Sequence, residues 1–130
     1  MGQQQLILII LAVVIVALAI VGGLVYYKDT AADLNRQAVR KDLEHITSLA
    51  KAHYRIPRSV GGGGNTFEGF TIPPTLLKNA NGTFLHIKDS HNENHIHFDG
   101  IGVEYGEDGV NPIHIEYRIE INEIKISTYN

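Results

Sequence analysis

The chain of 130 residues carries a formal net charge of −3 and contains no cysteine. The lack of thiols excludes disulfides, thiolate nucleophiles and thiolate metal sites, and the slightly acidic balance gives no sign of a nucleic-acid-binding surface. Without its apolar N-terminal run the chain keeps about 100 residues, which is enough for one small domain.

The N-terminal run has no charged residue, no proline, no Asn and no Asp between positions 6 and 27. As a helix it would be roughly 33 Å long, since each residue adds about 1.5 Å, and it could therefore span a bilayer. A cleaved signal peptide fits poorly, because residues 1–5 contain no Lys or Arg.

The helical pattern continues beyond the apolar run. We expect one helix from near Gln3 to near Tyr54. It should end before Pro57, because the residue that precedes a proline disfavours the helical conformation. Gly22 and Gly23 mark a point where this helix could bend or unwind, or else pack closely against a neighbouring helix. In its second half, apolar residues recur at spacings of three and four, which predicts an amphipathic stripe. The stripe is formed by Leu34, Ala38, Val39, Leu43, Ile46, Leu49, Ala50 and His53.

Residues 57–82 are rich in Gly and Pro and predict a loop region, within which residues 67–72 could be a short extended segment. The four glycines at 61–64 lack the preceding strand and following Lys of a phosphate loop. Beyond them, alternation of apolar and polar residues predicts three to five antiparallel strands within 83–126. A tight turn or a bulge is expected at Asp99 and Gly100.

The predicted strand 113–121 has one apolar and one polar face, so the sheet needs a cover, and the apolar stripe of the helix is available. The sequence therefore predicts an α+β fold, with a long N-terminal helix packed on a small antiparallel sheet. We divide the chain into an apolar helix (1–27), its amphipathic half (28–56), a Gly/Pro-rich loop region (57–82) and the sheet (83–130).

Three histidines near two carboxylates invite a metal hypothesis: His91, His95 and His97 with Glu93 and Asp99. His86 and His114 are also expected on polar faces, so zinc or nickel bound between two strands is conceivable. We favour an ordinary polar sheet face, and predict neither a metal nor a cofactor. Catalytic motifs of the H-E-x-x-H or G-x-S-x-G kind are absent, which argues against an enzyme.

The tripeptide Asn81-Gly82-Thr83 fits the N-glycosylation sequon at a predicted turn, so Asn81 is a candidate for modification. Such tripeptides are common by chance, and the modification depends on the organism.

The stretch GQQQLILIILAVVIVALAIVGG, followed by an amphipathic helical half, a Gly-rich loop and an antiparallel sheet, resembles a type IV pilin or pseudopilin. The resemblance implies that Met1 is a processed N-terminus, N-methylated after a prepilin peptidase removes a short leader. It implies as partners copies of the same chain in a helical homopolymer, the pilus assembly machinery, and the inner membrane before assembly. The mature location would be an extracellular filament.

Two positions depart from the pattern of that family. Gln5 stands where most members carry a glutamate that pairs with the N-terminal amine of a neighbour, although its amide oxygen could still accept a hydrogen bond. Gly22 stands where a proline is common, and the pair Gly22 and Gly23 could supply the same unwinding. The resemblance thus implies Met1, Gln5, Gly22 and Gly23 as assembly residues.

The expected function is structural: a filament subunit that polymerises through its N-terminal helix, for adhesion, motility or DNA uptake. A helix that is apolar on every face needs either lipid or a bundle of similar helices. A head-to-tail repeat that does not close then gives an open fibre. Two alternatives stay open: a pseudopilin of a secretion system, and a single-span membrane protein whose small domain binds a ligand or metal.

Overall fold

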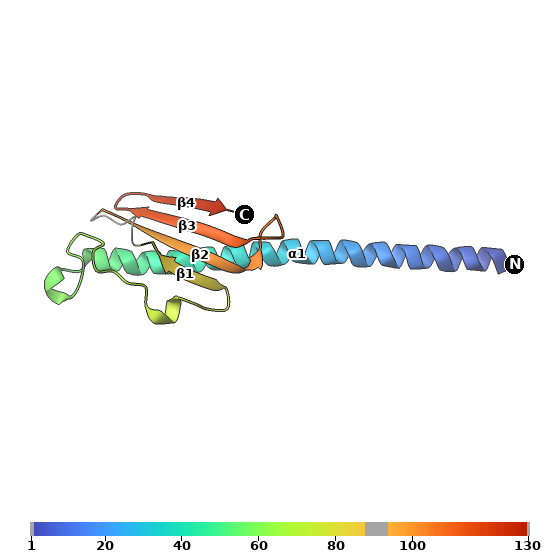
Figure 1. Cartoon of the computed structure of the whole chain (residues 1–130), viewed down its shortest axis with the longest axis horizontal. Helices are drawn as coiled ribbons and strands as arrows, with labels where there is room; N and C mark the ends of the chain where they lie inside the picture. The colour runs from blue at the N-terminus through green and yellow to red at the C-terminus, as the bar shows by residue number, and fades with distance from the viewer. Residues whose placement is uncertain (1, 88–93, 130) are drawn as a thin grey trace. The chain divides into compact units, whose positions relative to one another are not determined.

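A computed structural model describes residues 2–87 and 94–129 of the chain. One long helix, α1 (Gly2–Arg55), is followed by two 3-10 turns, η1 (Arg58–Val60) and η2 (Pro74–Leu76). Four strands then form one antiparallel sheet in sequential order (Figure 1): β1 (Gly82–His86), β2 (His95–Tyr105), β3 (Pro112–Glu120) and β4 (Ile124–Tyr129). The predicted α+β fold is confirmed.

The chain divides into two compact units at residue 31. The described part of the first unit, residues 2–31, is helical throughout and belongs to α1. The second unit, from residue 32 onward, combines the remainder of α1 with the loop region and the sheet, and it contains the hydrophobic core.

The tetraglycine run caps the C-terminal end of α1. The backbone N–H groups of Gly63 and Gly64 donate to the carbonyls of His53 and Ile56, at 2.8 and 2.9 Å. The next residue, Asn65, donates to the Tyr54 carbonyl at 2.8 Å. A helix end leaves its last carbonyls without intrahelical partners, and here the loop supplies the donors. The glycines therefore have a structural role that the sequence pattern did not reveal.

One stripe of α1 lies against the inner face of the sheet. The side chains of Val39, Leu43, Ile46 and Ala50 are buried, as the predicted stripe requires. Leu34 was wrongly included, because its side chain is 61% exposed. The sheet contributes buried residues from three strands: Phe84, Ile96, Phe98, Ile113, Ile115, Tyr117 and Ile119.

On the inner face of β2, Gly100 lies against the apolar stripe of α1. A Cβ atom added to Gly100 would lie 2.8 Å from Val39 Cγ1 and 2.9 Å from Leu43 Cδ1. Gly100 is therefore required for close packing, and the turn or bulge expected at Asp99 and Gly100 was wrong. Strand β2 continues through both residues, and its register changes farther along, between Ile101 and Tyr105.

Two further expectations about strands were wrong. Residues 67–72 form no strand, and their apolar side chains instead anchor a coil segment to the core. The Phe70 ring lies 5.8 Å from the ring of Phe98. His86 shares the inner face of β1 with buried Phe84, and its ring is 5.7 Å from Phe98, because Leu85 takes the outer face.

We predict that Leu43→Ala destabilises the fold by about 2–5 kcal/mol, since it opens a cavity under a fully buried side chain. The matched variant Leu34→Ala should stay within about 0.5 kcal/mol of the wild type, because Leu34 is exposed. Chemical unfolding of the full chain in detergent, followed by circular dichroism, measures both. Equal losses for the two leucines would contradict the observed packing.

Candidate functional site

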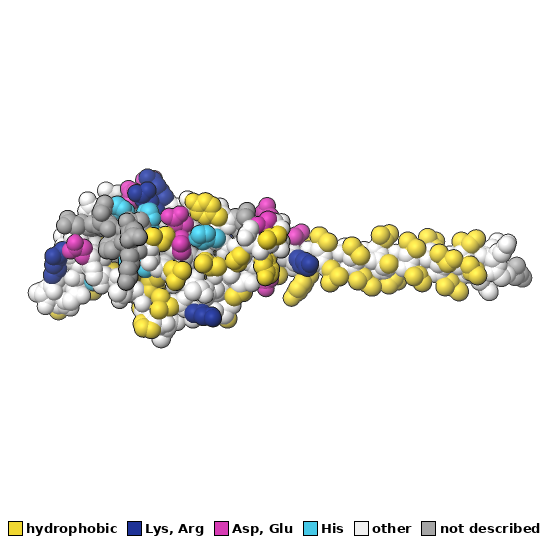
Figure 2. All heavy atoms as spheres, viewed as in Figure 1, with side chains coloured by type: hydrophobic (Ala, Val, Ile, Leu, Met, Phe, Trp, Pro, Cys, Tyr) yellow, Lys and Arg dark blue, Asp and Glu magenta, His cyan; other side chains and the backbone are white. Residues whose placement is uncertain are grey.

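The first part of α1 is exposed on every side. The large apolar side chains from Leu6 to Tyr27 are 48–76% exposed, and no charged residue lies among them. Figure 2 shows yellow hydrophobic side chains along the visible face of this segment. We call residues 6–27 the apolar rod. Exposed apolar surface of this extent marks a surface that is covered by lipid or by another protein.

Within the described part of the chain, α1 is the one helix long and apolar enough to cross a membrane. None of its most apolar stretch is buried within the protein. A rod of this length and composition fits membrane association.

Three of the expected assembly residues lie on the rod or beside it. Gln5 is exposed on the first turns of α1, and a Cβ atom added to Gly22 or Gly23 would meet no atom within 4 Å. The helix continues through both glycines without a break. The rod therefore lacks side chains at Gly22 and Gly23, and we call this gap in its surface the glycine notch. Met1 lies outside the described residues, and its methylation stays a prediction.

A polar clamp joins the second half of α1 to the sheet and was missed by the sequence analysis. Asn35 donates through Nδ2 to the Asn81 carbonyl at 2.8 Å and accepts at Oδ1 from the Glu104 N–H at 3.3 Å. About two helical turns farther along α1, Asp42 Oδ2 accepts hydrogen bonds from the side-chain amides of Asn79 and Asn81, at 2.9 and 2.8 Å. The available signal was the presence of polar residues at positions 35 and 42, seven apart beside an apolar stripe.

The clamp bears directly on the sequon at Asn81. The nitrogen that would carry a glycan, Nδ2, is the donor to Asp42. The side chain is half-buried, and its own backbone N–H donates to Asn79 Oδ1. Glycosylation of Asn81 stays a prediction, and it would require this hydrogen bond to open.

Two histidines of the sheet each lie close to one carboxylate on its outer face. His97 Nδ1 lies 3.2 Å from Glu116 Oε1, and His114 Nε2 lies 3.2 Å from Asp99 Oδ1. The rings of His95 and His97 are 5.5 Å apart, on the same face of β2 as predicted. Each carboxylate therefore serves one histidine, across the β2–β3 pair.

No group of three or more His, Asp or Glu in residues 2–87 and 94–129 is arranged to hold a metal ion. His91 and Glu93, which belonged to the metal hypothesis, lie outside the described residues. Among the described members, His86 faces the core, which separates it from the pairs on the outer face.

Burial lowers the pKa of His97 from its ordinary value of 6.5, and the nearby Arg118 guanidinium and His95 act in the same direction. The carboxylate of Glu116 opposes this shift without reversing it. The folded chain consequently takes up a proton on His97 at lower pH than the unfolded chain does.

We predict that the chain loses stability as the pH falls below about 6.5, because the unfolded state then binds more protons at His97 than the folded state. His97→Gln should make that loss shallower, whereas Ser48→Ala, at an exposed position of α1, removes no titratable group and should keep the wild-type slope. Unfolding free energies of the full chain in detergent between pH 7 and 5 measure the difference. A wild-type slope in His97→Gln would contradict the assignment.

The polar clamp gives a second prediction. Asn35→Ala leaves the Glu104 N–H and one bond of the Asn81 carbonyl unsatisfied, so the free energy of unfolding should fall by about 1–3 kcal/mol. Asn122→Ala, at an exposed turn between β3 and β4, is the matched control and should change little. Thermal or chemical unfolding decides between them. A neutral Asn35→Ala would mean that water replaces the clamp.

No protein-family model, curated protein or solved structure matches this chain.

Proposed function

We propose that this chain is the structural subunit of a type IV pilus-like filament, which polymerises through the apolar rod into an extracellular fibre. The observation that carries the proposal is the exposure of the rod on all its sides, whereas the second unit has a core of its own. One part of the molecule therefore needs partners, while the other can face water.

The rod offers a large driving force for association. Burying each Leu, Ile or Val side chain contributes about 1.5–3 kcal/mol, and the surface is apolar in all directions rather than along one seam. A seam would favour a dimer, because one stripe satisfies one partner. A surface that is apolar all round is satisfied only by several neighbours at once or by lipid, and this supports a rod at the centre of a fibre.

The glycine notch supports close packing of neighbouring rods. Gly22 and Gly23 have open space where a side chain would stand, and small residues allow helix backbones to approach closely in apolar surroundings. Near the start of the rod, Gln5 offers an amide oxygen that could accept a hydrogen bond from the N-terminal ammonium of a neighbour. This contact would replace the ion pair of the family that the sequence resembles.

The second unit supports a role as the outer surface of the fibre. Its core is buried between α1 and the sheet, and the outer face of β3 carries charged and polar side chains. Such a unit remains folded and hydrated while rods associate. The same features would serve a pseudopilin, whose filament stays short.

A second candidate function is that of a membrane-anchored protein, because α1 is long and apolar enough to cross a membrane. In that case the rod remains in lipid permanently, and the second unit is a small domain displayed at the membrane surface. The two candidates differ in one observable property, which is whether the rod leaves lipid to join other rods.

We predict that the purified chain forms fibres when detergent is removed in the absence of lipid, and that Val13→Asp abolishes them. Val13, in the rod, is 63% exposed, and its replacement would bury a carboxylate among apolar side chains. Val60→Asp is the matched control, since Val60 is 74% exposed in a 3-10 turn of the second unit. Negative-stain electron microscopy counts the fibres.

The outcomes separate the candidates. Fibres from the wild type and Val60→Asp but not from Val13→Asp support the filament. A chain that stays monomeric in lipid vesicles and gives only amorphous aggregate without lipid supports the membrane anchor. Fibres of equal length from Val13→Asp would contradict a role of the rod in assembly. Methylation of Met1, read by mass spectrometry of material from the native source, would favour the filament over the anchor.

A further inference from the structure

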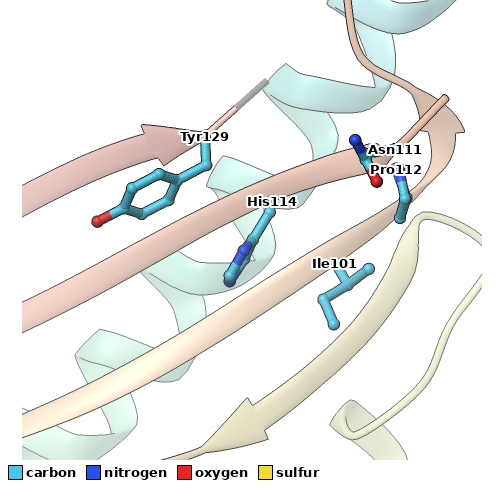
Figure 3. Close-up of a pocket in the computed structure, with 5 residues that line it drawn as sticks. All are labelled: Ile101, Asn111, Pro112, His114 and Tyr129. Carbon is cyan, nitrogen blue, oxygen red and sulfur yellow. The ribbon is translucent and has the colours of Figure 1, made fainter. Parts of the chain in front are cut away.

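A pocket of about 300 Å³ opens on the outer face of the sheet, on the side away from the core. Its lining residues are Ile101, Asn111, Pro112, His114 and Tyr129. Figure 3 shows that three of them come from adjacent strands, with Asn111 and Pro112 at the start of β3. The volume is at the small end of the range for ligand sites, about the size for one ring of a ligand.

The floor of the pocket is a single cross-strand row. Ile101 on β2 pairs with His114 on β3, which pairs with Tyr129 on β4. The rings of His114 and Tyr129 are 5.5 Å apart and inclined by 38°. All three side chains stand on the outer face and form an apolar and aromatic surface there. None of the three belongs to the hydrophobic core.

The next row of the sheet carries hydrogen-bond acceptors. Two residues along, Asp99 pairs with Glu116, and Glu116 pairs with Ser127. Asp99 Oδ1 lies 3.2 Å from His114 Nε2, so this row touches the pocket floor. Two carboxylates and a hydroxyl thus stand beside an aromatic surface, and a carboxylate can accept several hydrogen bonds from hydroxyl groups.

The wall of the pocket is held rigidly in place. Asn111 donates through Nδ2 to Asp108 Oδ2 at 2.6 Å, and its backbone N–H donates to Asp108 Oδ1 at 3.0 Å. The Val110 N–H also donates to Asp108 Oδ1, and these bonds lower the pKa of the Asp108 carboxyl. The loop is therefore organised before any ligand arrives, which reduces the ordering cost of binding.

We infer that this pocket binds one ring of a neutral saccharide. A sugar ring has an apolar face of C–H groups that can lie on the aromatic row, and a rim of hydroxyl groups that can donate to Asp99 and Glu116 and accept from Ser127. Neither lysine nor arginine lines the pocket, and two carboxylates stand beside it. Phosphate and carboxylate ligands are disfavoured by that charge. The inference does not depend on filament formation, because every contact lies within the second unit.

The test is saturation-transfer NMR on the full chain, held in a detergent whose head group contains no sugar. The probes are the methyl glycosides of glucose, galactose, mannose and N-acetylglucosamine, with glucose 6-phosphate and indole for comparison. We expect transfer to at least one glycoside. Tyr129→Ala should weaken that binding by about tenfold or more, because it removes the aromatic surface from the sugar.

Tyr105→Ala is the matched control, since Tyr105 is exposed to a similar extent (59% against 53% for Tyr129) but does not line the pocket. It should leave the affinity within about twofold of the wild type. A second variant, Ser127→Ala, should weaken binding from the polar row and leave the fold intact.

Three results would overturn the inference. The first is the absence of transfer to all four glycosides, and the second is undiminished transfer in Tyr129→Ala. The third is transfer to indole or glucose 6-phosphate with none to the neutral glycosides, which would make the pocket an apolar notch or an anion site. Fibre formation is measured separately, so a failure here leaves the proposed filament standing.

Discussion

The second unit depends on close packing between one stripe of α1 and the glycine-bearing end of β2. Gly100 lets Val39 and Leu43 approach the backbone of the strand, where the Cβ atom of any larger residue would force these side chains to shift. At that same end of the contact, the polar clamp of Asn35 and Asp42 holds the β1–β2 edge by hydrogen bonds instead of apolar contacts. Interiors are packed as densely as organic crystals, so a few residues set the position of the whole sheet on the helix.

This packing gives α1 two different surfaces along its length. After residue 31 the helix has one apolar stripe, which the sheet covers, and the opposite side faces water. Before that point the apolar residues extend around the entire helix and are exposed. The apolar stripe of the second half is covered by the sheet, whereas the apolar surface of the rod is covered by nothing within the chain. This difference is the reason for proposing that the chain works as one member of an assembly.

The sheet likewise has two faces with separate uses. Its inner face carries the isoleucines and phenylalanines that complete the core, whereas its outer face carries rows of aromatic, acidic and basic side chains. Each histidine–carboxylate contact on the outer face bridges β2 and β3. The outer face contributes no residue to the core cluster, so it is available for the saccharide pocket proposed above.

The long helix, its apolar rod, strand β3 and the α+β class could be predicted from the amino-acid sequence, because each depends on a pattern that is local to the chain. The sequence also indicated the buried positions Val39, Leu43, Ile46 and Ala50 through their spacing. The role of Gly100, the capping of α1 by the tetraglycine loop and the pairing of Asn81 with Asp42 became visible in the folded chain alone. Those features join residues far apart in the sequence, where a glycine or an asparagine signals a turn as readily as a close contact. The pocket likewise exists only because the register of three strands places Ile101, His114 and Tyr129 in one row.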